Sequence, residues 1–316
     1  MKLRGQHHIS SLTKDAKKNL AFYRNVLGMK LVKKTVNQDN TSFYHLFYAD
    51  EQGTPGTEVT FFEIPNLAQK HDGTNTINEI SLRVSSVAAL SFWKTRFERY
   101  QVTHNEVQTM NDTAVLPFQD PEGHKMLLVA ESDLDDKREP SSPEEIPNDY
   151  NILGLGPVRL KVQYVEPTSD VLTDVLGFTK KGEYKNGEHR VFVFEADRAG
   201  LSGQVHVEED KTSPKAREGR GSVHHVAFRV ETEEELQQWV KRIEDEGFQT
   251  SGFVDRYYFR SLYFREPNGI LYELATDGPG FAIDEPVDQL GKSLSLPDFL
   301  EPNRKEIEAK LQPLQT

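Results

Sequence analysis

Apolar and polar residues alternate in short runs along this chain, and each group of runs contains one longer segment with apolar residues at helical spacing. The first group predicts a strand, a helix and three further strands, at residues 5–11, 15–27, 29–36, 42–48 and 57–64. Thr13 stands where a helix-capping side chain is expected, Leu20 and neighbouring apolar residues share one helix face, and Gly28 follows the last turn. The predicted order of elements is therefore β-α-β-β-β.

The same order recurs along the rest of the chain, and this repetition is more informative than any single element. Similar tetrapeptides at 120–123 and 266–269 precede the last strand of the second and fourth groups. The predicted helices of the later groups are 87–100, 168–176 and 233–246. Their predicted strands are 77–84, 102–107, 114–118, 125–130, 158–164, 178–184, 189–195, 204–207, 222–230, 248–255, 260–264 and 270–275.

Repeats of this kind predict an α+β fold in which four β-α-β-β-β modules pair into two open-barrel domains. An acidic segment with three prolines separates the second and third modules and is expected to be a linker. The predicted boundaries are 1–66, 75–131, 152–210 and 219–277 for modules 1 to 4, 132–151 for the linker and 278–316 for a C-terminal tail. Within 297–314 of the tail, four apolar residues have the spacing of a surface-packed helix: Phe299, Leu300, Ile307 and Leu311.

Composition narrows the class of protein. With 50 acidic and 38 basic residues, the net charge is −12, which disfavours nucleic acid and anionic membranes as partners. The chain has no cysteine, so any metal site must use His, Asp, Glu or Tyr side chains. We find neither an N-terminal leader nor a run of about eighteen apolar residues, and we therefore expect a cytoplasmic protein. Phosphate-binding glycine motifs, zincin helices and serine nucleophile elbows are also missing from the sequence.

Two pairs of adjacent histidines, His7-His8 and His224-His225, open equivalent strands in a chain with only ten histidines. Because neighbouring strand residues point to opposite faces, each pair can direct one imidazole into a site. We predict that His8 and His225 bind one metal ion together with Glu273, which lies on the last strand of module 4. Two histidines and one carboxylate with open coordination positions suit an Fe(II) ion that binds substrate and O2 together, and Mn(II) accepts the same ligands.

The repeat tests this ligand set. The residues equivalent to the three predicted ligands in modules 2 and 3 are Glu79, Leu127 and Arg159. These modules therefore lack the set. A single site then requires modules 1 and 4 to pair around the metal, although they lie at opposite ends of the chain, and modules 2 and 3 to pair as a vestigial domain. A consecutive pairing, one with two and three with four, would separate His8 from His225.

Simpler interpretations compete with this prediction. A histidine in a strand is usually structural, and Glu273 could be a solvated strand residue. Its neighbours along the strand are apolar, however, and a carboxylate buried among them without a partner would be costly. Glu63 is a rival fourth ligand, and a fourth ligand would suit glyoxalase-type chemistry better. The repeat places Thr60, rather than Glu63, opposite Glu273.

Four segments carry a resemblance to a known family. They are Gly-Gln-His-His-Ile at 5–9, Ser-Val-His-His-Val at 222–226, Leu-Tyr-Glu-Leu-Ala-Thr-Asp at 271–277 and Pro-Asp-Phe-Leu-Glu-Pro at 297–302. With the four modules, they resemble the vicinal oxygen chelate superfamily, whose members include glyoxalase I, extradiol dioxygenases and thiol transferases that act on fosfomycin. Over nearly its full length, the chain more narrowly resembles ring-cleaving dioxygenases that act on hydroquinones.

The resemblance implies further site residues. His7 and His224 would lie near the substrate as hydrogen-bonding or acid–base groups, provided that a β-bulge or a strand end turns them inward. Arg256 and Tyr263 match positions that contact substrate in hydroquinone dioxygenases, where the arginine would orient a phenolate or carbonyl and the tyrosine would donate a proton. A surface arginine and a core tyrosine are the simpler alternatives. Ser10 shares the face of the first predicted ligand and is expected to line the pocket.

By resemblance, the expected function is that of an Fe(II)-dependent, extradiol-type dioxygenase that opens hydroquinone- or catechol-type rings with O2. Two alternatives stay open. A glyoxalase-type lyase or thiol transferase would need a fourth protein ligand and a metal without redox activity, and a small-aromatic-binding protein would need no chemistry. The expected partners are a small aromatic substrate and O2, without nucleic acid or membrane. A role in aromatic hydrocarbon catabolism or detoxification follows from resemblance only. The sequence leaves open the ring substituents, Fe versus Mn, and the oligomeric state, including a homo-oligomer.

Overall fold

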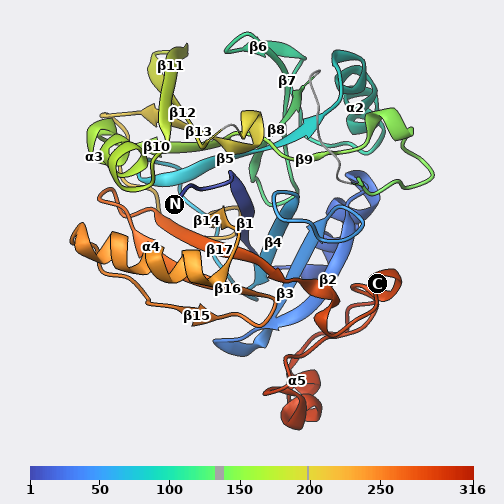
Figure 1. Cartoon of the computed structure of the whole chain (residues 1–316). Helices are drawn as coiled ribbons and strands as arrows, with labels where there is room; N and C mark the ends of the chain where they lie inside the picture. Colours follow the sequence, from blue (N-terminus) through green and yellow to red (C-terminus); the bar gives the residue numbers. More distant parts are fainter. Residues whose placement is uncertain (132–138, 198) are drawn as a thin grey trace.

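The computed structural model describes residues 1–131, 139–197 and 199–316 and contains two strongly curved β-sheets with helices on their outer faces (Figure 1). The chain is a mixed helix-and-strand protein built from two half-barrel sheets, which confirms the predicted fold class. The part of the predicted linker at 132–138 lies outside the described residues. No helix in the described ranges is long and apolar enough to cross a bilayer.

The first sheet contains strands from both ends of the chain, in the order β15-β16-β17-β14-β1-β4-β3-β2. The N-terminal strands are β1 (Gln6–Thr13), β2 (Lys30–Asn37), β3 (Asn40–Ala49) and β4 (Glu58–Glu63). The C-terminal strands are β14 (Val223–Val230), β15 (Val254–Asp255), β16 (Phe259–Arg265) and β17 (Leu271–Pro279). Because β1 and β14 pair antiparallel at its centre, side chains from both ends share one concave face. We propose that these strands correspond to modules 1 and 4.

The second sheet has the equivalent order β11-β12-β13-β10-β5-β8-β7-β6, and β9 pairs with β5 beside this path. We propose that it corresponds to modules 3 and 2. Its strands are β5 (Thr76–Val84), β6 (Gln108–Met110), β7 (Thr113–Gln119), β8 (Lys125–Ala130), β9 (Gly154–Leu155), β10 (Val158–Val162), β11 (Thr179–Asn186), β12 (His189–Glu195) and β13 (Gln204–Glu209).

Each module carries one helix between its first two strands, and the tail carries another. The α-helices are α1 (Ala16–Leu20), α2 (Val87–Arg99), α3 (Val165–Asp170), α4 (Glu233–Asp245) and α5 (Arg304–Lys310). Two of the predicted helices end in π-helical turns, η1 (Ala21–Val26) and η3 (Val171–Val175). Short 3₁₀ turns are η2 (Asn148–Tyr150), η4 (Gly200–Gly203), η5 (Phe281–Ile283), η6 (Val287–Gln289) and η7 (Glu301–Asn303).

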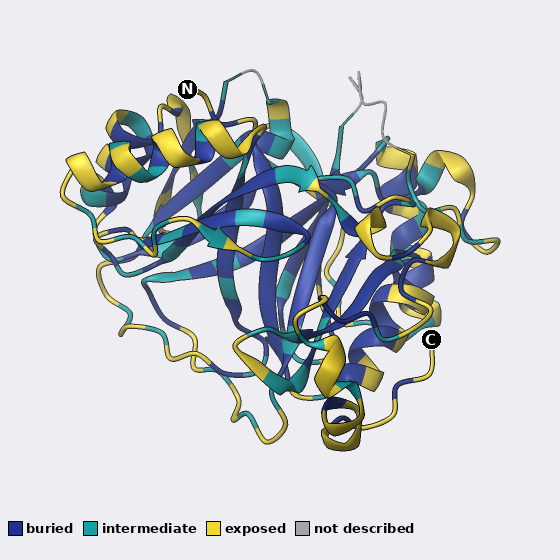
Figure 2. Cartoon of the chain, turned by 60° about the horizontal axis from the view of Figure 1, so that its bottom comes forward, coloured by how far each residue is buried: buried dark blue, intermediate teal, exposed yellow. Residues whose placement is uncertain are grey.

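The hydrophobic core lies between the convex faces of the two sheets and beneath the helices. Tyr23 of η1 illustrates this placement, because its ring packs on Phe61 of the first sheet and its hydroxyl lies 3.4 Å from Met126 Sδ in the second. Trp93 of α2 and Trp239 of α4 are buried as well. The strands are accordingly buried in the middle of the molecule, and the exposed faces of the helices lie outside (Figure 2). This packing leaves the concave faces free to line cavities.

Several predicted local features are wrong. Asp15, not Thr13, caps α1: the Asp15 carboxylate accepts a hydrogen bond from the Lys18 amide at 3.0 Å. The strand predicted at 102–107 does not form: this range has one isolated bridge, at His104, and β6 begins only at Gln108. The strand predicted at 248–255 is reduced to β15, with one isolated bridge at Thr250 before it.

The predicted tail helix is also shorter than expected, since it begins only after Pro302 in the preceding 3₁₀ turn. Ile307 and Leu311 are buried as its apolar face requires, and Ile307 lies in α5, which packs near β3. Phe299 lies outside this helix and is 59% exposed, so it does not take part in the predicted packing.

Candidate metal centre

Three neighbouring strands bring the predicted ligands together at the bottom of the first half-barrel. His8 on β1 and Glu273 on β17 both pair with Ala227 of the strand between them, and His225 lies two residues before Ala227. Because strand residues two apart share a face, all three side chains point into the same concavity. His8 Nε2 lies 3.3 Å from His225 Nε2 and 3.2 Å from Glu273 Oε2. His225 Nε2 lies 2.8 Å from the same carboxylate oxygen.

These distances fit a shared metal ion. Three ligand atoms about 2.1 Å from an ion, at right angles to one another, lie about 3.0 Å apart. The Glu273 side chain is 1% exposed, and its Oε2 forms no hydrogen bond to any described residue although two ring nitrogens lie close to it. Its other oxygen accepts a hydrogen bond from Ser261 Oγ at 2.5 Å. A buried, unpaired oxygen between two nitrogen atoms is the arrangement that a bound cation would satisfy.

The protonation states support the same conclusion. Burial would raise the pKa of Glu273, but the neighbouring His8 and His225 rings outweigh this effect and hold the pKa well below its usual range. Burial lowers the pKa of His225, which its contact with Glu273 opposes only in part. An ionised carboxylate and a neutral imidazole are the forms that bind a metal ion.

The first histidine of each pair also faces inward, because a β-bulge interrupts strand alternation at both positions. The register between β1 and β14 shifts between Gln6 and His8, and shifts again where Ser10 pairs with His225 and Ser11 pairs with Val223. His7 and His224 are the extra residues at these two shifts. Strand alternation alone would have turned both away from the site.

The bulges place each first histidine against the ring of the second. His7 Nδ1 lies 2.9 Å from His8 Nδ1, and His7 Nε2 donates a hydrogen bond to the Thr276 carbonyl at 3.0 Å. Burial lowers the pKa of His7 to about 3, so this ring is neutral and its Nδ1 must accept the proton of His8 Nδ1. The lone pair of His8 is thereby left on Nε2, the atom that faces His225 and Glu273.

The second pair repeats this contact. His224 Nδ1 lies 2.8 Å from His225 Nδ1, and burial lowers the pKa of His224 to about 4. A proton donated by His225 Nδ1 to His224 leaves the His225 lone pair on Nε2, again directed at the site. His7 and His224 are therefore placed where outer partners of metal-binding imidazoles lie.

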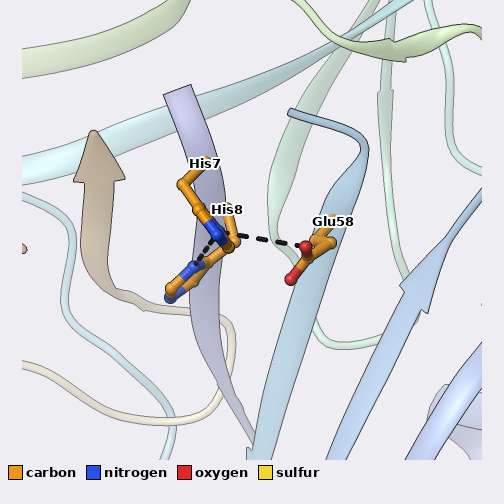
Figure 3. Close-up of side chains that lie close together, drawn as sticks. All are labelled: His7, His8 and Glu58. Carbon is orange, nitrogen blue, oxygen red and sulfur yellow. Dashed lines mark hydrogen bonds and ion pairs between the residues drawn. The ribbon is translucent and has the colours of Figure 1, made fainter. Parts of the chain in front are cut away.

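A second group of potential ligands shares one residue with the first (Figure 3). It consists of His7, His8 and Glu58, which lies on β4 directly beside His8. The group is looser, since His7 Nδ1 lies 3.9 Å from Glu58 Oε1. Burial, reinforced by the charges of nearby acidic residues, raises the pKa of Glu58 well above 4.5, which favours a neutral carboxyl group. The set with the ionised Glu273 is therefore the better metal site.

Glu58 provides a test of these electrostatics. In the folded protein its raised pKa keeps a proton that the unfolded chain releases above pH 4.5, so its contribution to stability falls as pH rises through this window. Glu58→Gln removes the titration. We therefore expect the difference in the free energy of unfolding, variant minus wild type, to increase above pH 4.5 by up to about 1.4 kcal/mol per pH unit.

The measurement is urea unfolding of the metal-free proteins at pH 5, 6 and 7. Glu234→Gln, on the exposed face of α4, is the matched control and should show a constant difference from wild type. A constant difference for Glu58→Gln as well would contradict the assignment of a buried neutral carboxyl group.

Above the three predicted ligands, the half-barrel encloses a cavity of about 500 Å³. This size is typical of sites for small organic molecules. Aromatic rings form part of its wall, together with aliphatic and polar side chains. The aromatic lining residues are Phe47, Phe62, Tyr258, Phe259 and Tyr263, and the polar ones away from the ligands include Ser10, His45, His224 and Arg256.

Arg256 and Tyr263 both line this cavity. Arg256 Nε donates to the Tyr263 hydroxyl at 3.3 Å, and its guanidinium lies 5.3 Å from the centre of the same ring. Arg256 also pairs with Asp39 at 3.1 Å, across the mouth of the cavity. Burial raises the pKa of Tyr263, so its hydroxyl keeps its proton. Both residues are placed to contact a bound molecule.

Glu63 and Thr60, which both lie on β4, have partners other than the predicted ligands. Glu63 does not join the site: its Oε1 accepts a hydrogen bond from the Ala16 amide at 2.9 Å, at the start of α1. Thr60, which the repeat aligns with Glu273, instead bonds to Ser10 Oγ at 2.7 Å and to His45 Nε2 at 3.0 Å. Sequence reasoning missed His45. The available signal was its alternation with Phe47 in the predicted strand 42–48, which puts both side chains on one face.

The second half-barrel has an ion pair where the first has its predicted ligands. Arg159 Nη2 lies 2.6 Å from Glu79 Oε2, and both side chains are buried. Leu127, the residue equivalent to Glu273, lines the small hollow around them. This buried pair joins a guanidinium to a carboxylate, so the two residues neutralise each other's charge.

Comparison with known proteins defines the class. The family model of the Glyoxalase/Bleomycin resistance protein/Dioxygenase superfamily matches residues 5–128 and 154–274, and the chain therefore belongs to this superfamily. This confirms the family resemblance.

Within the superfamily, the chain is similar to ring-cleaving dioxygenases. It is 52% identical over the full length of both chains to MhqA of Bacillus subtilis (strain 168), whose name assigns it as a ring-cleaving dioxygenase. It is 28% identical, over 97% of its length and 95% of the relative, to a chlorohydroquinone/hydroquinone 1,2-dioxygenase of Sphingobium indicum. A crystal structure described as a dioxygenase of B. subtilis superposes with a TM-score of 0.91 at 32% identity, covering 99% and 98% of the two chains.

Proposed function

We propose that this protein is an Fe(II)-dependent dioxygenase that opens hydroquinone-type aromatic rings with O2. The observation that carries the proposal is the cluster of His8, His225 and Glu273 in a cavity of about 500 Å³ whose wall includes five aromatic rings. Two neutral imidazoles and one carboxylate leave open positions on the metal for substrate and O2. The relatives named above support the reaction class, and the hydroquinone dioxygenase supports the substrate class.

When bound, Fe(II) supplies the redox chemistry that allows an aromatic ring to react with O2. The protein supplies positioning and proton control. The aromatic side chains of the wall can pack on a flat ring, and the Arg256 guanidinium is placed to bind an ionised phenolic oxygen. Tyr263, protonated and in contact with Arg256, can donate a hydrogen bond or a proton to a reacting oxygen.

The alternatives have less support. Glyoxalase-type chemistry would need a fourth ligand, and Glu63 is directed to α1 rather than into the cavity. A protein that only binds aromatics would have no need for an ionised carboxylate held beside two oriented imidazoles in its core. Both observations favour the oxygenase.

The proposal is tested by loading the protein with Fe(II) without oxygen, adding one substrate at a time and following O2 uptake. Hydroquinone and methylhydroquinone are expected to give one O2 consumed per ring opened, with loss of the aromatic absorbance. Phenol and a thiol-conjugated 2-oxoaldehyde serve as comparison compounds. If none of the hydroquinones and catechols tested causes O2 uptake, the oxygenase assignment is refuted. Turnover of the conjugate would support the lyase.

Arg256→Lys is expected to lower kcat/KM for hydroquinone by about 10- to 100-fold, because lysine keeps the charge but loses the planar donor fork. A hydrogen bond to a charged group contributes about 1.5–3 kcal/mol, which corresponds to this range. Arg260→Lys is the matched control, since Arg260 pairs with Glu233 and Asp255 and does not line the cavity. Equal kinetics for the two variants would rule out a substrate contact by Arg256.

A further inference from the structure

His45 is a cavity residue with no part in the predicted metal set. It lies within β3, and its ring packs between Phe47 and Phe62, with ring centres 4.0 Å from each. Phe62 in turn lies 6.5 Å, centre to centre, from the His225 ring. The imidazole is therefore held in a fixed orientation by aromatic neighbours, one of which also packs against a predicted ligand.

One nitrogen of this ring is bound to the protein and the other is not. Nε2 lies 3.0 Å from Thr60 Oγ1, and Thr60 lies 2.7 Å from Ser10 Oγ. Nδ1 has no hydrogen-bond partner among the described residues, and the residue lines the cavity. Nδ1 is not among the buried polar atoms that lack a partner, so it is open to the cavity, where a polar group of a bound molecule can pair with it.

The chain of hydroxyl groups behind His45 lets Nδ1 act in either direction. When Thr60 donates to Nε2, the ring proton sits on Nδ1, which then donates. When Nε2 donates to Thr60, Nδ1 is an acceptor, and Thr60 can donate in turn to Ser10. The imidazole can therefore pair with either a hydroxyl or a carbonyl oxygen of a ring.

The position of His45 selects one oxygen of the substrate. In the sheet order β16-β17-β14-β1-β4-β3, the strand of Tyr263 and the strand of His45 lie on opposite sides of the three ligand-bearing strands. A ring that binds at the predicted ligands through one oxygen thus lies between the Arg256–Tyr263 wall and the His45 wall. In a 1,4-diol the second oxygen lies on the opposite side of the ring from the oxygen at the predicted ligands, so it can reach the His45 wall. In a 1,2-diol the two oxygens are adjacent, so both lie at the predicted ligands.

We propose that His45 is a substrate-positioning residue whose Nδ1 hydrogen-bonds the second ring oxygen of a 1,4-diol, the oxygen remote from the metal. The assignment rests on the proposed function and deepens it, because it makes His45 the residue that favours hydroquinones over rings with a single hydroxyl.

The test is a binding cycle in which one hydroxyl is removed from the ligand and one imidazole from the protein. Dissociation constants of hydroquinone and phenol, which differ only in the second hydroxyl, are measured by calorimetry on the Fe(II)-loaded protein without oxygen. Wild type is expected to prefer hydroquinone by about tenfold, as one well-placed hydrogen bond provides. His45→Phe is expected to remove this preference by weakening hydroquinone binding and leaving phenol binding unchanged.

Two further variants identify the nitrogen. Asparagine places a polar group near the position of Nδ1 and glutamine near that of Nε2. His45→Asn should therefore keep more of the preference than His45→Gln. His189→Phe is the matched control, since His189 is half-buried in β12 of the other sheet, and it should bind both ligands as wild type does.

The outcomes distinguish a failure of the proposed role of His45 from a failure of the proposed function. If wild type binds hydroquinone but His45→Phe keeps the preference, or weakens both ligands equally, the role of His45 is refuted and the proposed function stands. If iron-loaded wild type binds neither ligand, the proposed function falls and the role of His45 falls with it.

Discussion

His225→Ala is expected to lower the affinity for Fe(II) by more than about a hundredfold, because loss of an outer partner of a metal ligand alone costs about 10- to 100-fold. The substitution removes one of two imidazoles and leaves the Glu273 carboxylate buried beside a single ring. Ring cleavage should fall below detection, since the remaining ligands cannot hold iron during turnover. Anaerobic titration of Fe(II) against a competing chelator measures the affinity.

His206→Ala is the matched control for this substitution. His206 is a buried histidine in the second sheet, with its own partners in Tyr184 and Gln204, and it lies outside the proposed metal centre. The His206→Ala variant should bind one iron ion with the affinity of wild type. Wild-type iron affinity in His225→Ala would remove this residue from the ligand set.

His224→Phe is expected to lower iron affinity by about 10- to 100-fold without removing a ligand. Phenylalanine fills the space of the ring but cannot accept the proton of His225 Nδ1, so the lone pair of His225 is no longer fixed on the nitrogen that faces Glu273. His224→Asn, which places an acceptor near the position of Nδ1, should recover part of the loss.

The affinity is measured without substrate, which separates orientation of the ligand from any contact between His224 and the substrate. If the phenylalanine variant binds iron as wild type does and only its KM changes, His224 is a substrate contact alone. Equal affinities of the phenylalanine and asparagine variants, both reduced, would indicate a packing defect.

The fold class was predictable because the alternation pattern recurs. One β-α-β-β-β segment is ambiguous, but four such segments with matching turns before their last strands restrict the architecture strongly. The His8, His225 and Glu273 side chains lie together because their strands are neighbours in the first sheet. The order of the strands along the chain does not predict this pairing, and only the residue types suggested it.

Local register was not predictable. The bulges that turn His7 and His224 inward shift pairing by one residue, and a shift of this kind leaves the alternation of apolar residues on either side intact. The cap of α1 was missed for a similar reason, since Thr13 and Asp15 are both good capping residues and only the backbone path decides between them. His45 stands alone in its strand, and a single histidine carries little information without its neighbours in space.

The central claim is that His8, His225 and Glu273 together bind one iron ion. Anomalous diffraction at the iron edge, from crystals loaded with Fe(II) without oxygen, tests it most directly. We predict one strong peak per chain, within about 2.5 Å of His8 Nε2, His225 Nε2 and Glu273 Oε2. A peak between His7, His8 and Glu58, or no peak in the first half-barrel, would contradict it.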